Sequence, residues 1–233
     1  MRSNGRARDD KRPVRIERGY LRNAEGSALI EMGNTRVICA ATVDNSVPKF
    51  LSGKGEGWVT AEYGMLPRST NSRMMREAIR GRGGRTYEIQ RLIGRSLRTA
   101  TQLNLMGELT VIVDCDVIEA DGGTRSASIT GGCVALYDAL SKVGYVEHPM
   151  NFFVSAVSVG VVGGVTMLDL DYQEDSSADV DLNLVMSETG AFIEIQGTAE
   201  KIPFDDERLG EMVALGRKGC LELIAAQKEA LGL

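Results

Sequence analysis

Two short segments combine a glycine pair with an arginine and a threonine, and each precedes a stretch with helical periodicity: Gly83-Gly84-Arg85-Thr86 and Gly122-Gly123-Thr124-Arg125. We call them the first and second glycine loops. Glycine lets backbone N–H groups approach a ligand closely, and a helix N-terminus adds unpaired donors with a partial positive charge. An arginine fork holds two phosphate oxygens at once. If the fold brings the loops together, they would clamp one phosphate; the alternative is two ordinary glycine turns.

Three aspartates gather further along the chain, Asp175, Asp179 and Asp181, directly after Glu174. The alternation of polar and apolar residues over 179–184 predicts a strand that projects Asp179 and Asp181 to one side, roughly 6–7 Å apart at Cα. Carboxylates this close raise each other's pKa unless a cation lies between them. The pair would suit a protonated general acid or a shared Mg²⁺ ion; the alternative is a solvated acidic loop beside an edge strand.

Arginine is concentrated in one part of the chain. Residues 68–98 contain nine arginines, two glutamates and no lysine, a formal charge of +7 in a chain whose net charge is −5. A basic patch on an acidic body favours a polyanionic partner, and arginine in place of lysine favours directional contacts with phosphate. The alternative is a solvated helix face or a contact between subunits.

Several other kinds of site are disfavoured. The four cysteines are widely spaced and form no C-x-x-C pair, which argues against zinc and thioredoxin-like sites and favours buried free thiols. His148 is the one histidine, so a Ser-His-Asp or Cys-His site is disfavoured. The glycine-rich stretch 53–57 precedes Trp58 instead of a helix and lacks a Gly-Lys-Ser/Thr ending, so it fits neither a P-loop nor a dinucleotide-binding turn.

The bulk composition is that of a globular protein. Of the 233 residues, 43% are hydrophobic, which is enough for a substantial core. No run approaches the ~18 apolar residues of a membrane span, and the basic N-terminus lacks the apolar segment of a secretory signal. We therefore expect a cytoplasmic protein with no membrane partner.

The hydrophobic pattern predicts alternating groups of strands and helices. Residues 51–72 are glycine-rich and are predicted to be irregular. One helix begins at Thr86, and another has an apolar face that runs from Ile129 to Leu140. The remaining predictions are strands over 14–17, 28–31, 36–43, 109–118, 152–162, 165–172, 179–184 and 192–196, and a closing helix over 206–231. This order gives an α+β architecture of two related βα halves packed together.

Nearly the whole chain resembles the ribonuclease PH family of bacterial type, whose members are phosphate-dependent 3′-exoribonucleases related to polynucleotide phosphorylase and to exosome ring subunits. The most specific runs are GWVTAEYGMLPRST at 57–70 and ADGGTR at 120–125. Further matches lie at 83–86, 88–93, 114–117, 174–176, 179–183 and 194–200. The resemblance implies a single ribonuclease PH-type domain over residues 1–233, similar to the fold of ribosomal protein S5 domain 2.

The resemblance also implies a reaction. Inorganic phosphate, as co-substrate, attacks the last phosphodiester of an RNA 3′ end and releases a nucleoside diphosphate. The family's phosphate-binding residues match Arg85, Gly123, Thr124 and Arg125. Because a phosphodiester is exchanged for a diphosphate linkage, we expect the reaction to be reversible, so that excess nucleoside diphosphate drives 3′ addition.

Metal and acid chemistry in related proteins falls to aspartates that match Asp175 and Asp181. The resemblance makes both of them catalytic and metal-binding candidates, with Mg²⁺ or Mn²⁺ as the ion, and the sequence does not divide the acid and metal roles between them. Arginines that match Arg68, Arg73 and Arg76 belong to a loop tied to RNA binding and ring assembly. The family forms a homohexamer, a trimer of dimers.

The substrate class implied by the resemblance is RNA with a short 3′ tail, such as precursor tRNA, together with rRNA. The segment 68–98 holds one aromatic residue, Tyr87, so we expect contacts with the RNA backbone, weak base preference and strong salt dependence. Two alternatives are a non-catalytic RNA-binding ring subunit and a small-molecule phosphotransferase. The first is disfavoured by the two arginine loops and the aspartates, and the second leaves the basic patch unused.

Overall fold

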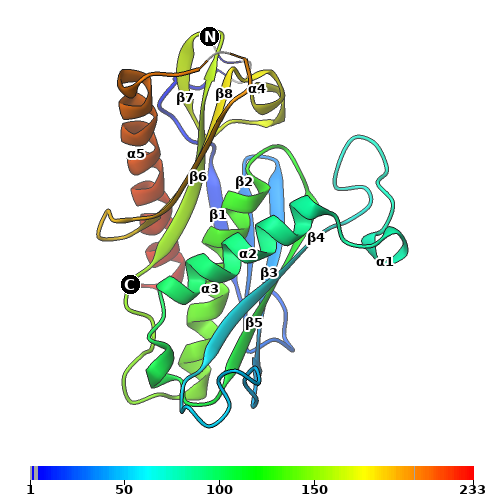
Figure 1. Cartoon of the computed structure of the whole chain (residues 1–233), viewed down its shortest axis with the longest axis vertical. Helices are drawn as coiled ribbons and strands as arrows, with labels where there is room; N and C mark the ends of the chain where they lie inside the picture. The colour runs from blue at the N-terminus through cyan, green and yellow to red at the C-terminus, as the bar shows by residue number, and fades with distance from the viewer. Residues whose placement is uncertain (1, 3–4, 202) are drawn as a thin grey trace.

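Two β-sheets and the helices between them form the frame of the protein (Figure 1). The computed structural model describes residues 2, 5–201 and 203–233. The strands are β1 (Val14–Arg18), β2 (Gly26–Met32), β3 (Thr35–Asp44), β4 (Trp58–Met65), β5 (Thr110–Glu119), β6 (Val154–Val162), β7 (Val165–Leu168), β8 (Val180–Ser187) and β9 (Phe192–Ala199). The helices are α1 (Glu77–Arg80), α2 (Gly84–Thr99), the 3₁₀ turn η1 (Leu103–Leu105), α3 (Thr124–Val143), α4 (Tyr172–Ser177) and α5 (Asp206–Leu231).

The first sheet has the strand order β1-β2-β3-β5-β4. Its strands pair antiparallel except for β4, which runs parallel to β5. Strand β4 corrects our prediction that residues 51–72 are irregular. Glycines dominate 53–57, but Trp58–Met65 alternates between buried and more exposed residues and pairs along its whole length with β5. Helix α2 packs on this strand.

Helix α3 is the centre of the core. It packs against β2, β3 and β5 of the first sheet and against β6 of the second, so it joins the two halves. Burial on several sides explains why its apolar residues are not confined to one stripe; fifteen of its twenty residues are buried. The predicted core residues from Ile129 to Leu140 lie there, and all four cysteines of the chain are buried free thiols, as expected.

The second sheet has the order β7-β6-β8-β9, all antiparallel. Helix α5 packs on β6, β7 and β8 and also reaches β1 of the first sheet. Strand β9 lies at the edge and is mostly exposed. The predicted strand 165–172 ends at Leu168, and the short helix α4, which was not predicted, follows.

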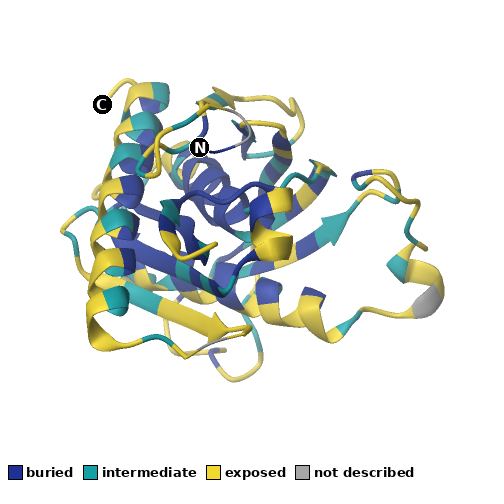
Figure 2. Cartoon of the chain, turned by 90° about the horizontal axis from the view of Figure 1, so that it is seen from above, coloured by how far each residue is buried: buried dark blue, intermediate teal, exposed yellow. Residues whose placement is uncertain are grey.

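The segment between β4 and α2, residues 66–83, extends away from the body and carries α1 (Figures 1 and 2). We call it the arm. Exposed apolar side chains lie on it, Met75 at 55% and Ile79 at 75% exposure, whereas buried residues concentrate in the sheets and α3.

The mixed architecture of two βα halves confirms the predicted α+β fold class. None of the helices described here has the length and hydrophobicity that a bilayer crossing requires.

Candidate active site

Both glycine loops lead directly into helices, as the sequence predicted. Helix α2 begins at Gly84 after Gly83, and α3 begins at Thr124 after Gly123. Neither helix has a side chain that caps its N-terminal N–H groups. These donors and the positive end of each helix are therefore available to an anion.

The fold brings the two loops together. They line one cavity of about 460 Å³. Arg85 enters it from the first loop, Gly123 and Thr124 from the second, and Asp175 from α4 in the other half of the molecule. Four of the predicted site residues, separated by up to 90 positions in the chain, therefore share one cavity.

The two loop arginines differ in their surroundings. Arg85 is exposed, and its side chain makes no hydrogen bond or ion pair with any residue that the structure describes. Arg125 donates from Nη1 to Oε1 of Gln196 over 2.7 Å and lies 3.4 Å from Oε1 of Glu88. Gln196 in turn donates to Glu88 over 3.0 Å. The guanidinium of Arg125 is thus held in place by neutral and acidic neighbours, and that of Arg85 is available to a ligand.

Asp175 and Asp181 form the acidic side of the site. Burial and the charge of Asp175 raise the pKa of Asp181 to about 6. Desolvation also raises the pKa of Asp175, against the opposing charges of Arg85 and Arg125. The same two arginines lower the pKa of Asp181. Both arginines therefore lie within electrostatic range of both aspartates.

Asp179 does not belong to this group. It precedes β8, and its Oδ1 accepts a hydrogen bond from Nζ of Lys201 over 3.0 Å. That bond lowers the pKa of Asp179. The prediction that the two carboxylates raise each other's pKa is wrong for Asp179, because the hydrogen bond from Lys201 stabilises its ionised form.

The hydroxyl of Tyr63 lies 2.9 Å from Oγ1 of Thr124. Tyr63 is buried on β4, and burial raises its pKa. The bond fixes the side chain of Thr124 at the first turn of α3. Sequence reasoning misses Tyr63, Glu88 and Gln196 as site residues, although each lies within a segment that resembles the family. No local pattern distinguishes them, because their partners come from other elements.

The glycines of the second loop also meet a requirement of the fold itself. Gly122 and Gly123 have φ values of 75° and 66°, which favour glycine. A Cβ on Gly122 would lie 2.6 Å from the carbonyl oxygen of Leu170, and one on Gly123 would lie 2.8 Å from Nη2 of Arg12. The missing side chains make room for protein neighbours.

The residues present are compatible with a divalent cation. Oδ1 of Asp181 is buried and has no hydrogen-bond partner, and Asp175 offers a second carboxylate. The described part of the chain contains no cluster of three or more acidic, histidine or cysteine side chains arranged to hold a metal. Two carboxylates fit Mg²⁺, which keeps several waters and takes its other ligands from substrate phosphates.

The predicted basic patch is divided by internal contacts. Arg82 pairs with Glu62 over 2.6 Å, Arg95 pairs with Glu194 over 2.8 Å, and Arg98 lies 4.4 Å from the centroid of the Trp58 ring. The predicted RNA-binding or assembly residues, in contrast, are exposed on the arm, and their side chains have no hydrogen-bond or ion-pair partner among the described residues: Arg68, Arg73 and Arg76. Arg68 also lines a second cavity of about 880 Å³.

Known structures share this fold. Rice (Oryza sativa) Rrp46 superposes with a TM-score of 0.80 at 20% identity, covering 99% of this chain and 100% of that chain. A structure of the Archaeoglobus fulgidus exosome with RNA bound to the active site gives 0.81 at 20% identity, over 95% and 91% of the two chains. An archaeal exosome core gives 0.79 at 20% identity, over 97% and 91%.

Family models match most of the sequence. The model described as the 3′ exoribonuclease family, domain 1, matches residues 10–141, which contain both glycine loops. The model for domain 2 of the same family matches residues 153–219, which contain Asp175 and Asp181. The chain therefore belongs to the 3′ exoribonuclease family, and its candidate site lies between the parts that the two models cover.

Proposed function

We propose that this protein is a phosphate-dependent 3′→5′ exoribonuclease. The observation that carries the proposal is the shared cavity, in which two helix N-termini and Arg85 face Asp175. Such a site binds an anion on one side and presents carboxylates on the other, which is the arrangement that phosphoryl transfer uses.

Phosphate binding falls to the two glycine loops in this proposal. Arg85 contributes a guanidinium that no described side chain engages, and Arg125, held by Gln196, contributes a second one. Backbone N–H groups at Gly123 and Thr124 add donors at the start of α3. These contacts would orient one phosphate oxygen in line with the terminal phosphodiester of the RNA.

The reaction exchanges one bond to phosphorus for another. An oxygen of inorganic phosphate bonds to the phosphorus of the last nucleotide, and the bond from that phosphorus to the preceding 3′ oxygen breaks. Asp181, whose pKa is about 6, donates a proton to the departing oxygen. The products are a nucleoside diphosphate and RNA shortened by one nucleotide, and the same residues serve the reverse addition.

The alternative role for Asp181 is that of an ionised ligand, which would hold Mg²⁺ or Mn²⁺ together with Asp175. Such an ion would neutralise charge on the phosphates. The unpartnered Oδ1 of Asp181 supports this assignment, and the raised pKa of the same residue supports the acid role.

The polymer substrate and the assembly are further parts of the proposal. The exposed arm arginines Arg68, Arg73 and Arg76 would contact RNA phosphates, a neighbouring subunit, or both. The Archaeoglobus fulgidus exosome, which shares the fold, has RNA bound to its active site. By the family resemblance we propose a cytoplasmic homohexamer, a trimer of dimers, that trims the 3′ ends of precursor tRNA and rRNA.

The test is a product analysis. The protein is incubated with Mg²⁺ and an RNA hairpin with a 3′ tail, with and without inorganic phosphate, and the released nucleotides are identified. We expect nucleoside diphosphates only with phosphate, and far fewer from the Arg125→Ala variant at the same, sub-saturating phosphate concentration. Monophosphates released without phosphate would make the protein a hydrolase. RNA binding without release would favour a non-catalytic ring subunit.

A further inference from the structure

The buried side chain of Arg12 holds the carboxylate of Asp169 with a two-pronged contact. Nε donates to Oδ2 over 3.0 Å and Nη2 donates to Oδ1 over 2.7 Å, while the backbone N–H of Arg12 donates to Oδ2 over 2.7 Å. The two side chains are 4% and 1% exposed. Nη1 donates to the carbonyl oxygens of Asp121, over 2.5 Å, and Gly122, over 3.4 Å. One guanidinium thus joins the second glycine loop to the segment that enters α4.

Asp169 is held in an unusual backbone conformation. Its φ of 53° makes it the one non-glycine residue in the described part of the chain with a positive φ. Aspartate tolerates this region better than most L-residues, and the contacts that Arg12 makes to its side chain help to hold it there. Asp171 then caps α4 by accepting hydrogen bonds from the N–H groups of Gln173 and Glu174, which starts the helix that carries Asp175. The turn at Asp169 therefore lies two residues before the cap that starts α4.

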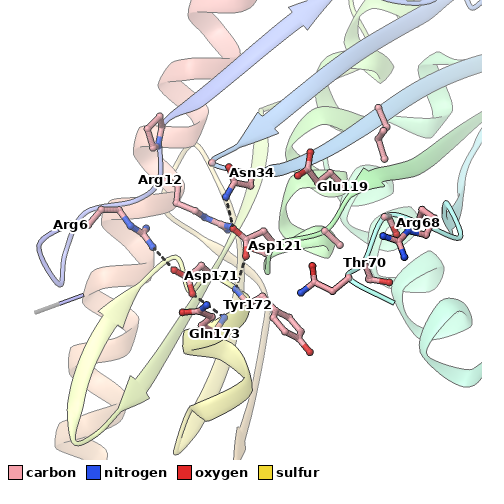
Figure 3. A pocket seen from close by; sticks show the side chains of 16 residues that line it. Arg6, Arg12, Asn34, Arg68, Thr70, Glu119, Asp121, Asp171, Tyr172 and Gln173 are labelled. Atoms are coloured by element: carbon pink, nitrogen blue, oxygen red, sulfur yellow. Dashed lines mark hydrogen bonds and ion pairs between the residues drawn. The ribbon is translucent and has the colours of Figure 1, made fainter. Parts of the chain in front are cut away.

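The second glycine loop is fitted closely against the same segment. Oδ1 of Asp121 accepts from the N–H of Tyr172 over 3.3 Å, and Oδ2 accepts from Nδ2 of Asn34 over 3.1 Å. Figure 3 shows Arg12, Asn34 and Tyr172 around Asp121 at the wall of the larger cavity. Because side chains are absent at Gly122 and Gly123, the loop lies in contact with Leu170 and Arg12.

We propose that Arg12 is a positioning residue, whose fork sets the second glycine loop at a fixed distance from the carboxylates that α4 and β8 provide. This inference rests on the proposed function. The phosphate donors belong to one half of the molecule and Asp175 and Asp181 belong to the other, so their spacing depends on the contacts that cross between the halves. Arg12 contacts both halves, because it binds the carboxylate of Asp169 and the carbonyl oxygens of Asp121 and Gly122.

The planar guanidinium of Arg12 is required because it donates to four oxygens that lie in different directions. These are the two carboxylate oxygens of Asp169 and the carbonyl oxygens of Asp121 and Gly122. Lysine keeps the charge but offers a single point donor, so it cannot hold both Asp169 oxygens and the loop carbonyls together. A displacement of about 1 Å between reacting groups lowers a rate on the order of 100-fold. Phosphate binding by Arg85, Arg125 and the helix N-termini does not need that spacing.

The experiment compares kcat and KM for phosphate in Arg12→Lys, Asp169→Asn and the double variant, with the wild-type chain measured first. We expect kcat to fall about 10- to 100-fold while KM for phosphate stays within about threefold. Because the two residues act as one pair, the double variant should lose no more kcat than the less active of the two single variants. Thermal stabilisation by added inorganic phosphate should persist in all three.

Arg18→Lys is the matched control. Arg18 grips Asp138 with the same two-pronged geometry, over 3.1 and 2.6 Å, at the other end of α3. This variant should lose stability yet keep kcat. If Arg18→Lys lost as much kcat as Arg12→Lys, the effect would be attributed to general destabilisation. If Arg12→Lys raised KM for phosphate at unchanged kcat, Arg12 would be a binding residue. Unchanged kinetics in Asp169→Asn would overturn the proposal.

Failure of the proposed function has a separate signature. In that case the wild-type chain itself releases no nucleoside diphosphate. If an Arg12 variant does not fold, Asp169→Asn, which conserves side-chain volume, still decides the question.

Discussion

Asp179 and Asp181 are separated by one residue, yet their carboxyl pKa values shift in opposite directions. A hydrogen bond from Lys201 lowers the pKa of Asp179. Burial and the charge of Asp175 raise the pKa of Asp181 to about 6. The ionised form of Asp179 is stabilised by its surroundings, whereas that of Asp181 is destabilised. A carboxylate whose ionised form is destabilised in this way is typical of a functional site.

The first prediction concerns the stability of Asp181→Asn. The folded-state pKa of Asp181 lies above the ordinary value of about 3.9, so its contribution to stability is present below that pH and is lost as pH rises through about 6. Asparagine removes the penalty of the ionised form. We expect the variant to gain about 1–3 kcal/mol in free energy of unfolding at pH 7.5 and almost nothing at pH 4. Denaturant titrations at both pH values measure this.

Asp179→Asn is the control for this prediction. Its lowered pKa gives the opposite sign, because the ionised form is stabilised above its unfolded-state pKa and that stabilisation is lost as pH falls. The variant should therefore not gain stability at pH 7.5. A gain in both variants would show that the effect does not come from the burial of Asp181.

The second prediction separates the phosphate-binding arginines from their neighbours. Arg85→Ala and Arg125→Ala should each raise KM for phosphate about 10- to 100-fold, because each removes charge-assisted hydrogen bonds worth roughly 1.5–3 kcal/mol. Arg91→Ala is the matched control, since Arg91 is exposed on α2 and no described residue pairs with it. Initial rates at varied phosphate concentration give KM for each variant. An equal rise in KM for Arg91→Ala would contradict the assignment of Arg85 and Arg125 to phosphate binding.

The third prediction tests the fit of the second glycine loop. Gly123→Ala places a Cβ 2.8 Å from Nη2 of Arg12 at a φ of 66°. Gly163→Ala, at a φ of 56°, places a Cβ in open space. Both variants should lose about 1 kcal/mol through backbone strain. Gly123→Ala should lose about 1–3 kcal/mol more of its free energy of unfolding through overpacking. It should also lose activity, because the second glycine loop is displaced.

Thermal or denaturant unfolding of the two glycine variants, followed by a phosphorolysis assay, gives the comparison. Equal stability losses would show that Arg12 moves aside without penalty. Full activity in Gly123→Ala would show that the loop tolerates displacement.

The fourth prediction concerns the arm. Arg73 and Arg76 are exposed without described partners, whereas Arg95 is paired with Glu194. In the double variant Arg73→Ala, Arg76→Ala, the plot of log binding constant against log salt concentration should become less steep. The magnitude of its slope should fall by about 1.4, or roughly 0.7 for each contact with single-stranded RNA. Arg95→Gln should leave the slope nearly unchanged. Fluorescence anisotropy at several salt concentrations measures it.

Sedimentation of the same double variant separates RNA binding from assembly. Smaller particles that bind RNA with the wild-type slope would assign Arg73 and Arg76 to subunit contacts. A wild-type slope near zero would rule out phosphate contacts altogether.

Elements with strong local patterns could be predicted from the sequence. The long strand β5, the helices α2, α3 and α5 and the buried face from Ile129 to Leu140 all follow from hydrophobic periodicity. The position of both glycine loops immediately before helices follows from the same pattern. These features depend on residues a few positions apart, so the sequence alone specifies them.

Two elements escaped prediction for related reasons. Strand β4 follows a glycine-rich stretch, and its partner β5 is about fifty residues away. Helix α4 has six residues, too few for a periodic pattern, and depends on the cap from Asp171 and on the grip of Arg2 on Glu174 over 2.6 and 2.7 Å. Both owe their form to distant parts of the chain.

The sequence by itself determined which residue types are available for chemistry: two arginine-bearing glycine loops and a group of aspartates. Only the tertiary structure decided that Asp175 raises the pKa of Asp181 while Lys201 lowers that of Asp179, and that Arg12 binds Asp169 across 157 positions. The reason is physical. A pKa and an ion pair depend on desolvation and on distances between charges, and both are set when folding brings remote segments together.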